Sequence, residues 1–364
     1  MRSILIAGGG TGGHLMPALA IADALVRLDA DVEPVLVGAR RGVEARILPT
    51  RPYRYYLLPA EPIYRAQWWR NLRWPVLAAR VLSLAREIVR REQPAVAVGT
   101  GGYAAGPPLV AAARARVPLV LQEQNAYPGF TTRRLSPRAA QVHLGFPEAR
   151  QHLRVALGTA VHTFGNPVAP PPDPRPTPAQ AKTALGIDPA RPALLVFGGS
   201  QGARALNAVV SAAVEQGLFD HVAVLWGTGP AAFDRYRHLH APPARVIRAF
   251  WDPIAEAYAA ADLVLSRSGA MTTAEVCTWG RPAVYVPLPS AAGDHQTANA
   301  RALADGGAAM LVPEVELRPE PLGALVRDLF ASGNRLESMG AAAASRGHPK
   351  AAESIARTVL TLVA

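Results

Sequence analysis

Short apolar runs alternate with stretches of helical periodicity along most of the 364-residue chain. Strands that are apolar at successive positions, rather than at every second one, are typical of parallel sheets covered by helices on both faces. The alternation therefore predicts an α/β fold with parallel sheets in both halves of the chain. The expected strands are Ile4–Ala7, Val32–Val37, Ala95–Val98, Leu119–Leu121, Leu194–Phe197, Val222–Leu225, Val246–Ala249, Leu263–Leu265 and Ala283–Val286.

A proline-rich segment interrupts this alternation near the middle of the chain. Pro167 is followed by the dense run Pro170–Pro178. Because proline fixes φ and lacks the backbone N–H, such a run forms neither a helix nor a central strand. We therefore expect two Rossmann-like, doubly wound domains, residues 1–165 and 166–344, that face a cleft. A helix within 345–364 can return to pack on the first domain.

Each half opens with a strand, a glycine-rich loop and a helix. The first loop contains Thr11, Gly12 and Gly13 and ends at His14, and the second contains Ser200 and Gln201. Glycine lets the backbone turn sharply and approach a ligand, and the following helix offers its N-terminal N–H groups to an anion. His14 has the chemistry of a general base.

The first loop also satisfies the G-x-G-x-x-G pattern of dinucleotide sites. That interpretation requires an acidic residue at the end of the second strand to bind the ribose. Asp31 and Glu33 lie at the opposite end of that strand. The sequence therefore disfavours NAD, and we expect no cofactor.

Polar residues follow several strands of the first half. His14, Tyr103, Glu123 and Asn125 would meet at one edge of the sheet, where they could orient a sugar hydroxyl and remove its proton. The alternative is that His14 caps its helix and Glu123 pairs with a nearby Arg.

The second half has a polar loop after the strand that ends at Leu265. Arg267, together with hydroxyls and amides at a helix start, suits a diphosphate, and Glu275 could accept bonds from both ribose hydroxyls. Its alternative role is to compensate the helix dipole. His295, Gln296 and Asn299 could reach a sugar, although Asp294 and His295 could equally form an ordinary N-cap. No D-x-D motif or His/Cys cluster predicts a metal near these loops.

The formal net charge of +11 belongs entirely to the first half. Residues 1–165 carry 21 Lys and Arg against 10 Asp and Glu, whereas residues 166–364 carry 17 of each. This asymmetry indicates an anionic partner for the first half: a membrane surface, a nucleic acid or a polyanionic substrate. A single cysteine, Cys277, excludes an internal disulfide.

The stretch from Ile63 to Leu82 combines tryptophan with arginine. Trp favours the headgroup region of a bilayer, and Arg is attracted to anionic lipid. The expected membrane contacts are Trp68, Trp69, Trp74 and Leu77. The alternative is an amphipathic helix whose tryptophans pack inward.

An ordered set of motifs resembles one enzyme family along the whole chain. The motifs are Gly9–His14, Gly101–Tyr103, Glu123–Asn125, Gly165–Pro167, Gly198–Ala203, Arg267–Ala270, Glu275 and Asp294–Gln296. They are similar to those of the peptidoglycan N-acetylglucosaminyltransferases that convert lipid I to lipid II, which have the two-domain GT-B fold.

The resemblance implies an inverting transfer of GlcNAc from UDP-GlcNAc to the C4 hydroxyl of undecaprenyl-linked lipid I. His14 would be the base, and the first domain would bind the acceptor. The enzyme would be peripheral, on the anionic cytoplasmic face of the bacterial inner membrane, with no nucleic acid partner. In the second domain, the nucleotide sugar would contact Ser200, Gln201, Trp251, Arg267, Ala270, Met271, Thr272, Thr273, Ala274, Glu275, His295, Gln296 and Asn299.

Some positions depart from the family pattern. Gln122 stands where many members have His, Ala169 where an Arg is common, and Trp251 where the residue is usually aliphatic. A diacylglycerol glycosyltransferase is the main alternative within the fold. A UDP-sugar 2-epimerase would not need a lipid-facing basic patch, and a non-catalytic basic protein would not need the acid–base and nucleotide residues.

Overall fold

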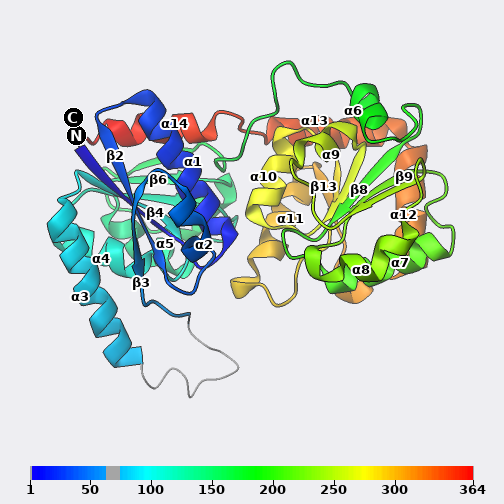
Figure 1. The fold of residues 1–364 in the computed structure, drawn as a ribbon. Coiled ribbons are helices and arrows are strands. Elements are labelled where there is room, and N and C mark those ends of the chain that lie inside the picture. The colour runs from blue at the N-terminus through cyan, green and yellow to red at the C-terminus, as the bar shows by residue number, and fades with distance from the viewer. Residues whose placement is uncertain (1, 63–73, 364) are drawn as a thin grey trace. The chain divides into compact units, whose positions relative to one another are not determined.

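The structure is a computed structural model that describes residues 2–62 and 74–363. Its contacts divide the chain into two compact units, one of Met1–Val168 with Lys350–Ala364 and the other of Ala169–Pro349 (Figure 1). Residues 164–177, which include all of the proline-rich segment except Pro178, form neither helix nor strand. Each unit is built on its own parallel sheet, so the α/β class predicted from the sequence is confirmed.

The first unit contains a seven-stranded sheet in the order β3-β2-β1-β4-β5-β6-β7, with every neighbouring pair parallel. Its strands are β1 (Arg2–Gly8), β2 (Val32–Ala39), β3 (Arg54–Leu58), β4 (Val96–Gly101), β5 (Leu119–Glu123), β6 (Gln141–Leu144) and β7 (Ala160–Thr163). Its helices are α1 (Gly12–Leu28), α2 (Glu44–Ile47), α3 (Trp74–Glu92), α4 (Gly106–Arg114), α5 (Phe130–Leu135) and α14 (Ala351–Leu360).

Both faces of this sheet are buried, which explains the continuous apolar runs. Successive side chains of a strand point to opposite faces. Leu5 and Ala7 therefore belong to the core beneath α3 and α4, whereas Ile4 and Ile6 pack beneath α1 and α14. A strand that alternated apolar and polar residues would place charge in one of these two cores.

The C-terminal helix α14 belongs to the first unit. Ile355 and Val359 of this helix are fully buried in the same core as Leu19 and Leu25 of α1. Figure 1 shows α14 alongside α1, with both termini at the same side of the unit. The chain thus returns to its first unit after completing the second.

The second unit contains a six-stranded parallel sheet in the order β10-β9-β8-β11-β12-β13. Its strands are β8 (Ala193–Phe197), β9 (Ala223–Gly227), β10 (Arg245–Arg248), β11 (Leu263–Ser266), β12 (Ala283–Tyr285) and β13 (Ala309–Leu311). Its helices are α6 (Pro178–Ala184), α7 (Arg204–Glu215), α8 (Phe233–Tyr236), α9 (Ala255–Ala260), α10 (Ala270–Thr278), α11 (His295–Asp305), α12 (Pro319–Ala331) and α13 (Gly333–Ser345).

Every strand expected from the sequence is present, and β3, β6, β7 and β13 are additional. The additional strands lie at or next to a sheet edge. Three of them contain polar residues, as in the sequence Gln-Val-His-Leu of β6, and β13 is an apolar run of only three residues. The apolar pattern detects central strands and misses these.

Within the described residues, no helix is both long and apolar enough to cross a membrane. Cys277 is buried and unpaired, as a chain with a single cysteine requires.

Candidate functional site

The first glycine loop lies at the carboxyl end of β1, next to the corresponding end of β4. Gly10 has φ of +94°, and a Cβ there would lie 2.4 Å from Cε1 of Tyr103. At Gly102, a Cβ would lie 2.0 Å from the carbonyl oxygen of Gly9. Glycine is required at Gly102 because the backbone of Gly9 lies against it, and at Gly10 because φ is positive and the Tyr103 ring lies against it.

The buried carboxylate of Glu44 holds this loop through hydrogen bonds. Its oxygens accept hydrogen bonds from the Gly10 N–H at 2.9 and 3.1 Å and from the Ala39 N–H at 2.7 Å. Glu44 is fully buried, and the missing side chains of Gly9 and Gly38 leave room for it. Sequence reasoning missed Glu44. The available signal was an acidic residue shortly after the second strand, beyond the position that a ribose-binding acid would occupy.

His14 is fixed through one of its ring nitrogens. Nδ1 lies 3.0 Å from the carbonyl oxygen of Thr100 and 3.0 Å from Oε1 of Gln124. Both partners are acceptors, so we assign the ring hydrogen to Nδ1. This tautomer leaves Nε2 unprotonated and able to accept a proton. The arrangement suits a general base better than a helix cap.

Gln124 owes its orientation to further hydrogen bonds. Its Nε2 donates to the carbonyl oxygens of Thr100 at 2.8 Å and Gln122 at 2.9 Å, and also contacts the Gln122 side chain. Gln122 in turn donates to Asn166 at 3.0 Å. The departure at Gln122 therefore places an amide within the network that orients His14. The sequence had not identified Thr100 or Gln124 as site residues.

Glu123, expected to take part in acid–base chemistry, is committed to its own loop. Oε1 accepts from the backbone and side-chain N–H groups of Asn125 at 3.1 and 3.2 Å, and Oε2 accepts from the Gly129 N–H at 3.0 Å. It is 3% exposed. Its bonds shape the loop after β5, and its partners are amides rather than the arginine considered as an alternative.

The second glycine loop, between β8 and α7, is built differently. Gly202 has φ of +76°, and a Cβ there would lie 2.2 Å from the Thr228 carbonyl oxygen. Gly199 has φ of +84°, but a Cβ there would meet open space. Ser200 and Gln201 are exposed at the top of the loop. The loop therefore presents its backbone and one hydroxyl outward.

Glu275 lies on α10, one turn past the loop that follows β11. Oε2 accepts a hydrogen bond from the Tyr258 hydroxyl at 2.9 Å. Burial raises the pKa of the Glu275 carboxyl to about 6, and the bond from Tyr258 opposes this shift. A half-buried carboxylate with one oxygen fixed suits a ligand that supplies hydroxyl groups.

The other residues of α10 that were expected to contact the nucleotide sugar lie in the first turns of the helix. Thr273 is buried, with its hydroxyl bonded to the Ala270 carbonyl oxygen at 2.9 Å, and the rest are half-buried. The half-buried residues are Ala270, Met271, Thr272 and Ala274. Gly269, the N-cap, makes no side-chain capping bond.

Gln296 is fixed at the start of α11 through both its side chain and its backbone. Oε1 accepts from the Leu288 N–H at 2.9 Å, and its carbonyl oxygen accepts from the Ser268 hydroxyl at 2.8 Å. Asn299 is buried and donates to the Ser268 carbonyl oxygen at 3.1 Å. His295 Nδ1 bonds the Ala292 carbonyl oxygen at 2.6 Å, whereas Asp294, the N-cap residue of α11, makes no side-chain capping hydrogen bond.

The guanidinium of Arg267, which was expected to bind a diphosphate, is bonded to other groups of the protein. It is bonded to two backbone carbonyl groups and to Glu314 instead of being presented to a diphosphate. The side chain is 8% exposed. Its partners come from residues 286–287 and from Glu314, which no local pattern in the sequence reveals.

Trp251, whose role the sequence left open, is buried to 2% exposure. The Arg248 guanidinium lies over its ring, 4.4 Å from the centroid, and a Cβ on Gly227 would touch the ring. The ring therefore packs against the end of β9, and a cation lies over one of its faces.

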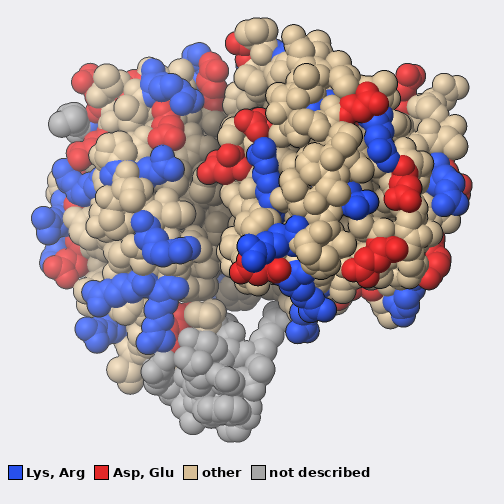
Figure 2. Space-filling view, turned by 45° about the vertical axis from the view of Figure 1, so that its right-hand side comes forward, with Lys and Arg blue, Asp and Glu red and all other residues tan. Residues whose placement is uncertain are grey.

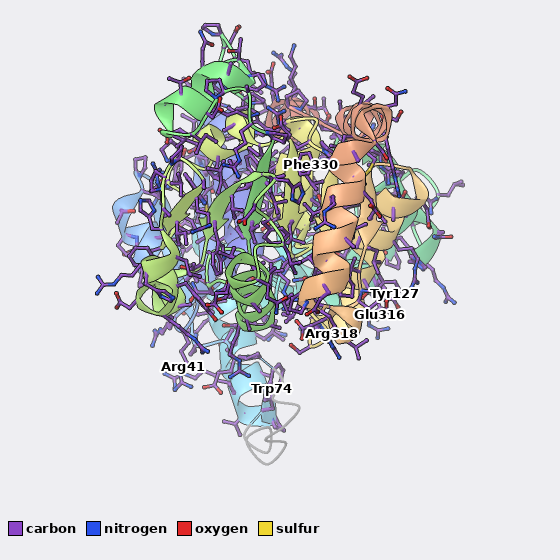
Figure 3. The ribbon with its side chains drawn as sticks, turned by 90° about the vertical axis from the view of Figure 1, so that its right-hand side faces the viewer. Arg41, Trp74, Tyr127, Glu316, Arg318 and Phe330 are labelled. Atoms are coloured by element: carbon purple, nitrogen blue, oxygen red, sulfur yellow. The ribbon has the colours of Figure 1, made fainter. Side chains whose placement is uncertain are left out.

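Of the expected membrane contacts, Trp68 and Trp69 lie outside the described residues. Trp74 begins α3 and is half-buried, while Leu77 is partly buried against the core. Figure 3 shows Trp74 at the end of α3 farthest from the sheet. Val76, which lies between Trp74 and Leu77 in the sequence, is 77% exposed. Figure 2 shows several Lys and Arg side chains close together on the visible face of this unit.

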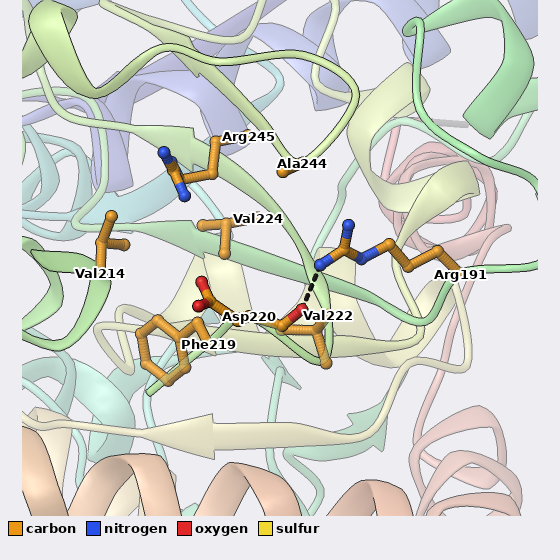
Figure 4. A pocket seen from close by; sticks show the side chains of 8 residues that line it. All are labelled: Arg191, Val214, Phe219, Asp220, Val222, Val224, Ala244 and Arg245. Atoms are coloured by element: carbon orange, nitrogen blue, oxygen red, sulfur yellow. Dashed lines mark hydrogen bonds between the residues drawn. The ribbon is translucent and has the colours of Figure 1, made fainter. Parts of the chain in front are cut away.

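A small pocket lies in the second unit, at the end of the sheet opposite to the residues expected to bind the nucleotide. Val222, Val224 and Arg245 line it at the amino ends of β9 and β10 (Figure 4). Arg191 donates to the Asp220 carbonyl oxygen beside it. Ligands in parallel sheets bind beyond the carboxyl ends, and none of the expected site residues lines this pocket. Among the described residues, no cluster of His, Cys, Asp or Glu has the arrangement of a metal site.

Comparison with known families identifies both units. Residues 4–144 match the glycosyltransferase family 28 N-terminal domain, and residues 193–355 match the glycosyltransferase family 28 C-terminal domain. The chain belongs to glycosyltransferase family 28. The family resemblance and the two-domain glycosyltransferase fold predicted from the motifs are thereby confirmed.

Family 28 relatives match this chain over nearly its full length. A protein of Chlorobium limicola is 38% identical over 99% of both chains, and one of Syntrophotalea carbinolica is 40% identical over 97% of both. Both are named UDP-N-acetylglucosamine–N-acetylmuramyl-(pentapeptide) pyrophosphoryl-undecaprenol N-acetylglucosamine transferase. The crystal structure of Acinetobacter baumannii MurG is similar with a TM-score of 0.79 and 29% identity, over 99% of both chains.

Proposed function

We propose that the protein transfers GlcNAc from UDP-GlcNAc to the C4 hydroxyl of the MurNAc residue of undecaprenyl-linked lipid I, forming lipid II. The observation that carries this proposal is the similarity, over almost the whole of both chains, to relatives named for that transfer. The motifs that resemble this family are distributed over both units, so the likeness is not confined to a shared nucleotide fold.

His14 acts as the base in this proposal. Nδ1 is occupied by the Thr100 carbonyl group and Gln124, so Nε2 takes the proton of the acceptor hydroxyl. The hydroxyl oxygen then forms its bond to C1 of GlcNAc as the bond from C1 to the diphosphate oxygen breaks, and UDP leaves with that electron pair. A single displacement of this kind inverts the configuration at C1 and gives the β1→4 linkage.

The second unit binds UDP-GlcNAc in this proposal. Glu275 holds the ribose hydroxyls, and the amides of residues 198–203 with the Ser200 hydroxyl hold the diphosphate. Gln296 contacts the sugar. The open space above Gly199 and the half-buried carboxylate of Glu275 support these roles. Amide groups, rather than a metal ion, would stabilise the charge on departing UDP.

A transfer assay tests the reaction. Purified protein is given radiolabelled UDP-GlcNAc with lipid I, with diacylglycerol, or with no acceptor. We expect label only in the lipid I product, of β1→4 linkage. Label in diacylglycerol would support the alternative lipid glycosyltransferase, and conversion of the sugar nucleotide without an acceptor would support an epimerase.

We also propose that the first unit binds the cytoplasmic face of the bacterial inner membrane through the segment that includes Trp68, Trp69 and Trp74. The exposed arginines of α3, the exposure of Val76 and the basic excess of residues 1–165 support this proposal. Arg attracts anionic lipid with about 1 kcal/mol per charge near the surface.

Vesicle co-sedimentation tests the membrane proposal. Replacing the three tryptophans by Ser should weaken binding to anionic vesicles while UDP binding persists. Val315→Ser is the matched control, because Val315 is 75% exposed but belongs to the second unit. A triple variant that melts far below the wild type would instead indicate tryptophans packed in the core, and undiminished sedimentation would contradict the proposal.

A further inference from the structure

The guanidinium of Arg267 is surrounded by acceptors from two segments of the second unit, residues 286–287 and Glu314. Nη1 donates to the carbonyl oxygens of Val286 and Pro287, each at 3.0 Å, and Nη2 pairs with the Glu314 carboxylate. Glu314 begins the short helix η8 (Glu314–Glu316) and is 26% exposed at its side chain. The cation is therefore neutralised within the protein and fixed in direction by its planar donors.

These bonds fix the segment that holds Gln296. The two carbonyl groups precede Leu288, whose N–H donates to Oε1 of Gln296 at 2.9 Å. Ser268, the neighbour of Arg267, binds the Gln296 backbone at 2.8 Å. A continuous chain of contacts thus leads from Glu314 through Arg267 and the loop at 286–288 to the side-chain amide of Gln296.

We propose that Arg267 and Glu314 are positioning residues that set Gln296 for the sugar of the nucleotide donor, and that Arg267 is not a ligand of the diphosphate. This inference rests on the proposed use of UDP-GlcNAc. For Arg267 to reach a phosphate, it would have to leave Glu314 and two buried carbonyl groups without their partner, which carries a desolvation cost. In this proposal Gln296 contacts the sugar and not the uridine. Changes to Arg267 or Glu314 therefore affect the binding only of ligands that carry the sugar.

The two roles predict opposite results for Glu314→Gln. In a positioning role, loss of the carboxylate loosens the loop and weakens UDP-GlcNAc binding about 3- to 10-fold, the range for a lost hydrogen bond, while UDP binding stays within about twofold. In a ligand role, the variant releases a cation toward the diphosphate, so UDP and UDP-GlcNAc both bind more tightly.

Titration calorimetry with UDP and with UDP-GlcNAc measures this difference. Glu316→Gln is the matched control, since Glu316 is exposed on the same short helix, just before α12 (Figure 3). Arg267→Lys should resemble Glu314→Gln, because one ammonium group cannot span both carbonyls and the carboxylate. The double variant should be little worse than either single variant if the pair acts as one unit.

Steady-state kinetics adds a second measurement. We expect the KM for UDP-GlcNAc to rise in Glu314→Gln, with a smaller change in kcat, and Glu314→Asp, which keeps the charge, to recover part of the loss. If Glu314→Gln does not fold, the same comparison is made with Glu314→Asp against Glu316→Asp. Equal changes for UDP and UDP-GlcNAc, or no change for either, would overturn the positioning role. Failure of the wild type to bind UDP-GlcNAc would instead overturn the proposed function.

Discussion

The two glycine loops begin from the same local design and end in different states. In the first unit, the Gly10 N–H donates to the internal carboxylate of Glu44, and the ring of Tyr103 covers the loop. In the second unit, the position above Gly199 is open, and Ser200 is exposed. The first loop is thus occupied by side chains of the protein itself, whereas the second presents an open position and an exposed hydroxyl. A glycine-rich loop before a helix does not by itself specify a phosphate site.

The largest effect should come from the base that the first loop supports. His14→Ala should lower turnover by ~10²–10⁴-fold, the range for a lost general base. UDP affinity should be nearly unchanged, because the nucleotide residues belong to the other unit. Single-turnover kinetics with lipid I, together with calorimetry for UDP, measures both quantities. Near-normal turnover in the variant would assign the base to another group.

Loss of the internal anion of the first loop should have a smaller effect than loss of His14, comparable in size with the effect expected for Glu275. Glu44→Gln keeps the shape of the side chain but turns an NH₂ group toward backbone N–H donors. We expect a loss of stability of about 1–3 kcal/mol, since buried N–H groups lose their acceptor. Thermal melting and the acceptor KM should both report it. Unaltered melting would show that the carboxylate is not required to hold the loop.

In the second unit, we propose that the carboxylate of Glu275 binds a ligand rather than a neighbouring loop. Glu275→Gln should weaken UDP binding by about 1.5–3 kcal/mol, the range for hydrogen bonds to a charged group. Because the pKa of Glu275 is raised to about 6, the wild type should lose affinity as the pH falls through 6 and the carboxylate is protonated. UDP itself also titrates in this region, so the measured quantity is the difference between wild type and variant. Parallel pH profiles would exclude Glu275 from the site.

Tyr258 offers a finer test of the same carboxylate. Its hydroxyl donates to Glu275 and lowers the pKa of that carboxyl. Tyr258→Phe removes the hydrogen bond, so the pKa should rise further and the pH at which UDP affinity is lost should move upward. Calorimetry between about pH 5 and pH 8 measures the shift. A midpoint that moves down would contradict the assigned direction.

The last prediction compares the two loops directly, through the difference in melting temperature between two Gly→Ala variants. Gly10→Ala and Gly199→Ala both force a side chain into positive φ, which costs about 1–2 kcal/mol. Only at Gly10 does the new Cβ also collide with Tyr103; at Gly199 it meets open space. Gly10→Ala should therefore melt at the lower temperature. Equal melting temperatures would mean that the first loop is not packed more tightly than the second.

The sequence by itself determined the α/β class, the strands of the sheet centres and the positions of both glycine loops. These features depend on local patterns: apolar runs that two helix layers bury, and glycines where the backbone must turn. The family motifs added the chemistry expected at each strand end, including His14 and Glu275. Four strands at or next to a sheet edge were missed because they are short or contain polar residues, whereas the edge strand β10 was predicted.

Only the tertiary structure decided which of these polar groups remain available to a ligand and which are bonded to other groups of the protein. Glu44 and Gly10 are far apart in the sequence, as are Arg267 and Glu314, and no local pattern encodes either contact. Whether a charged side chain is free or neutralised depends on the acceptors and donors that folding brings around it. That information arises only when the strand ends are aligned at the same edge of each sheet.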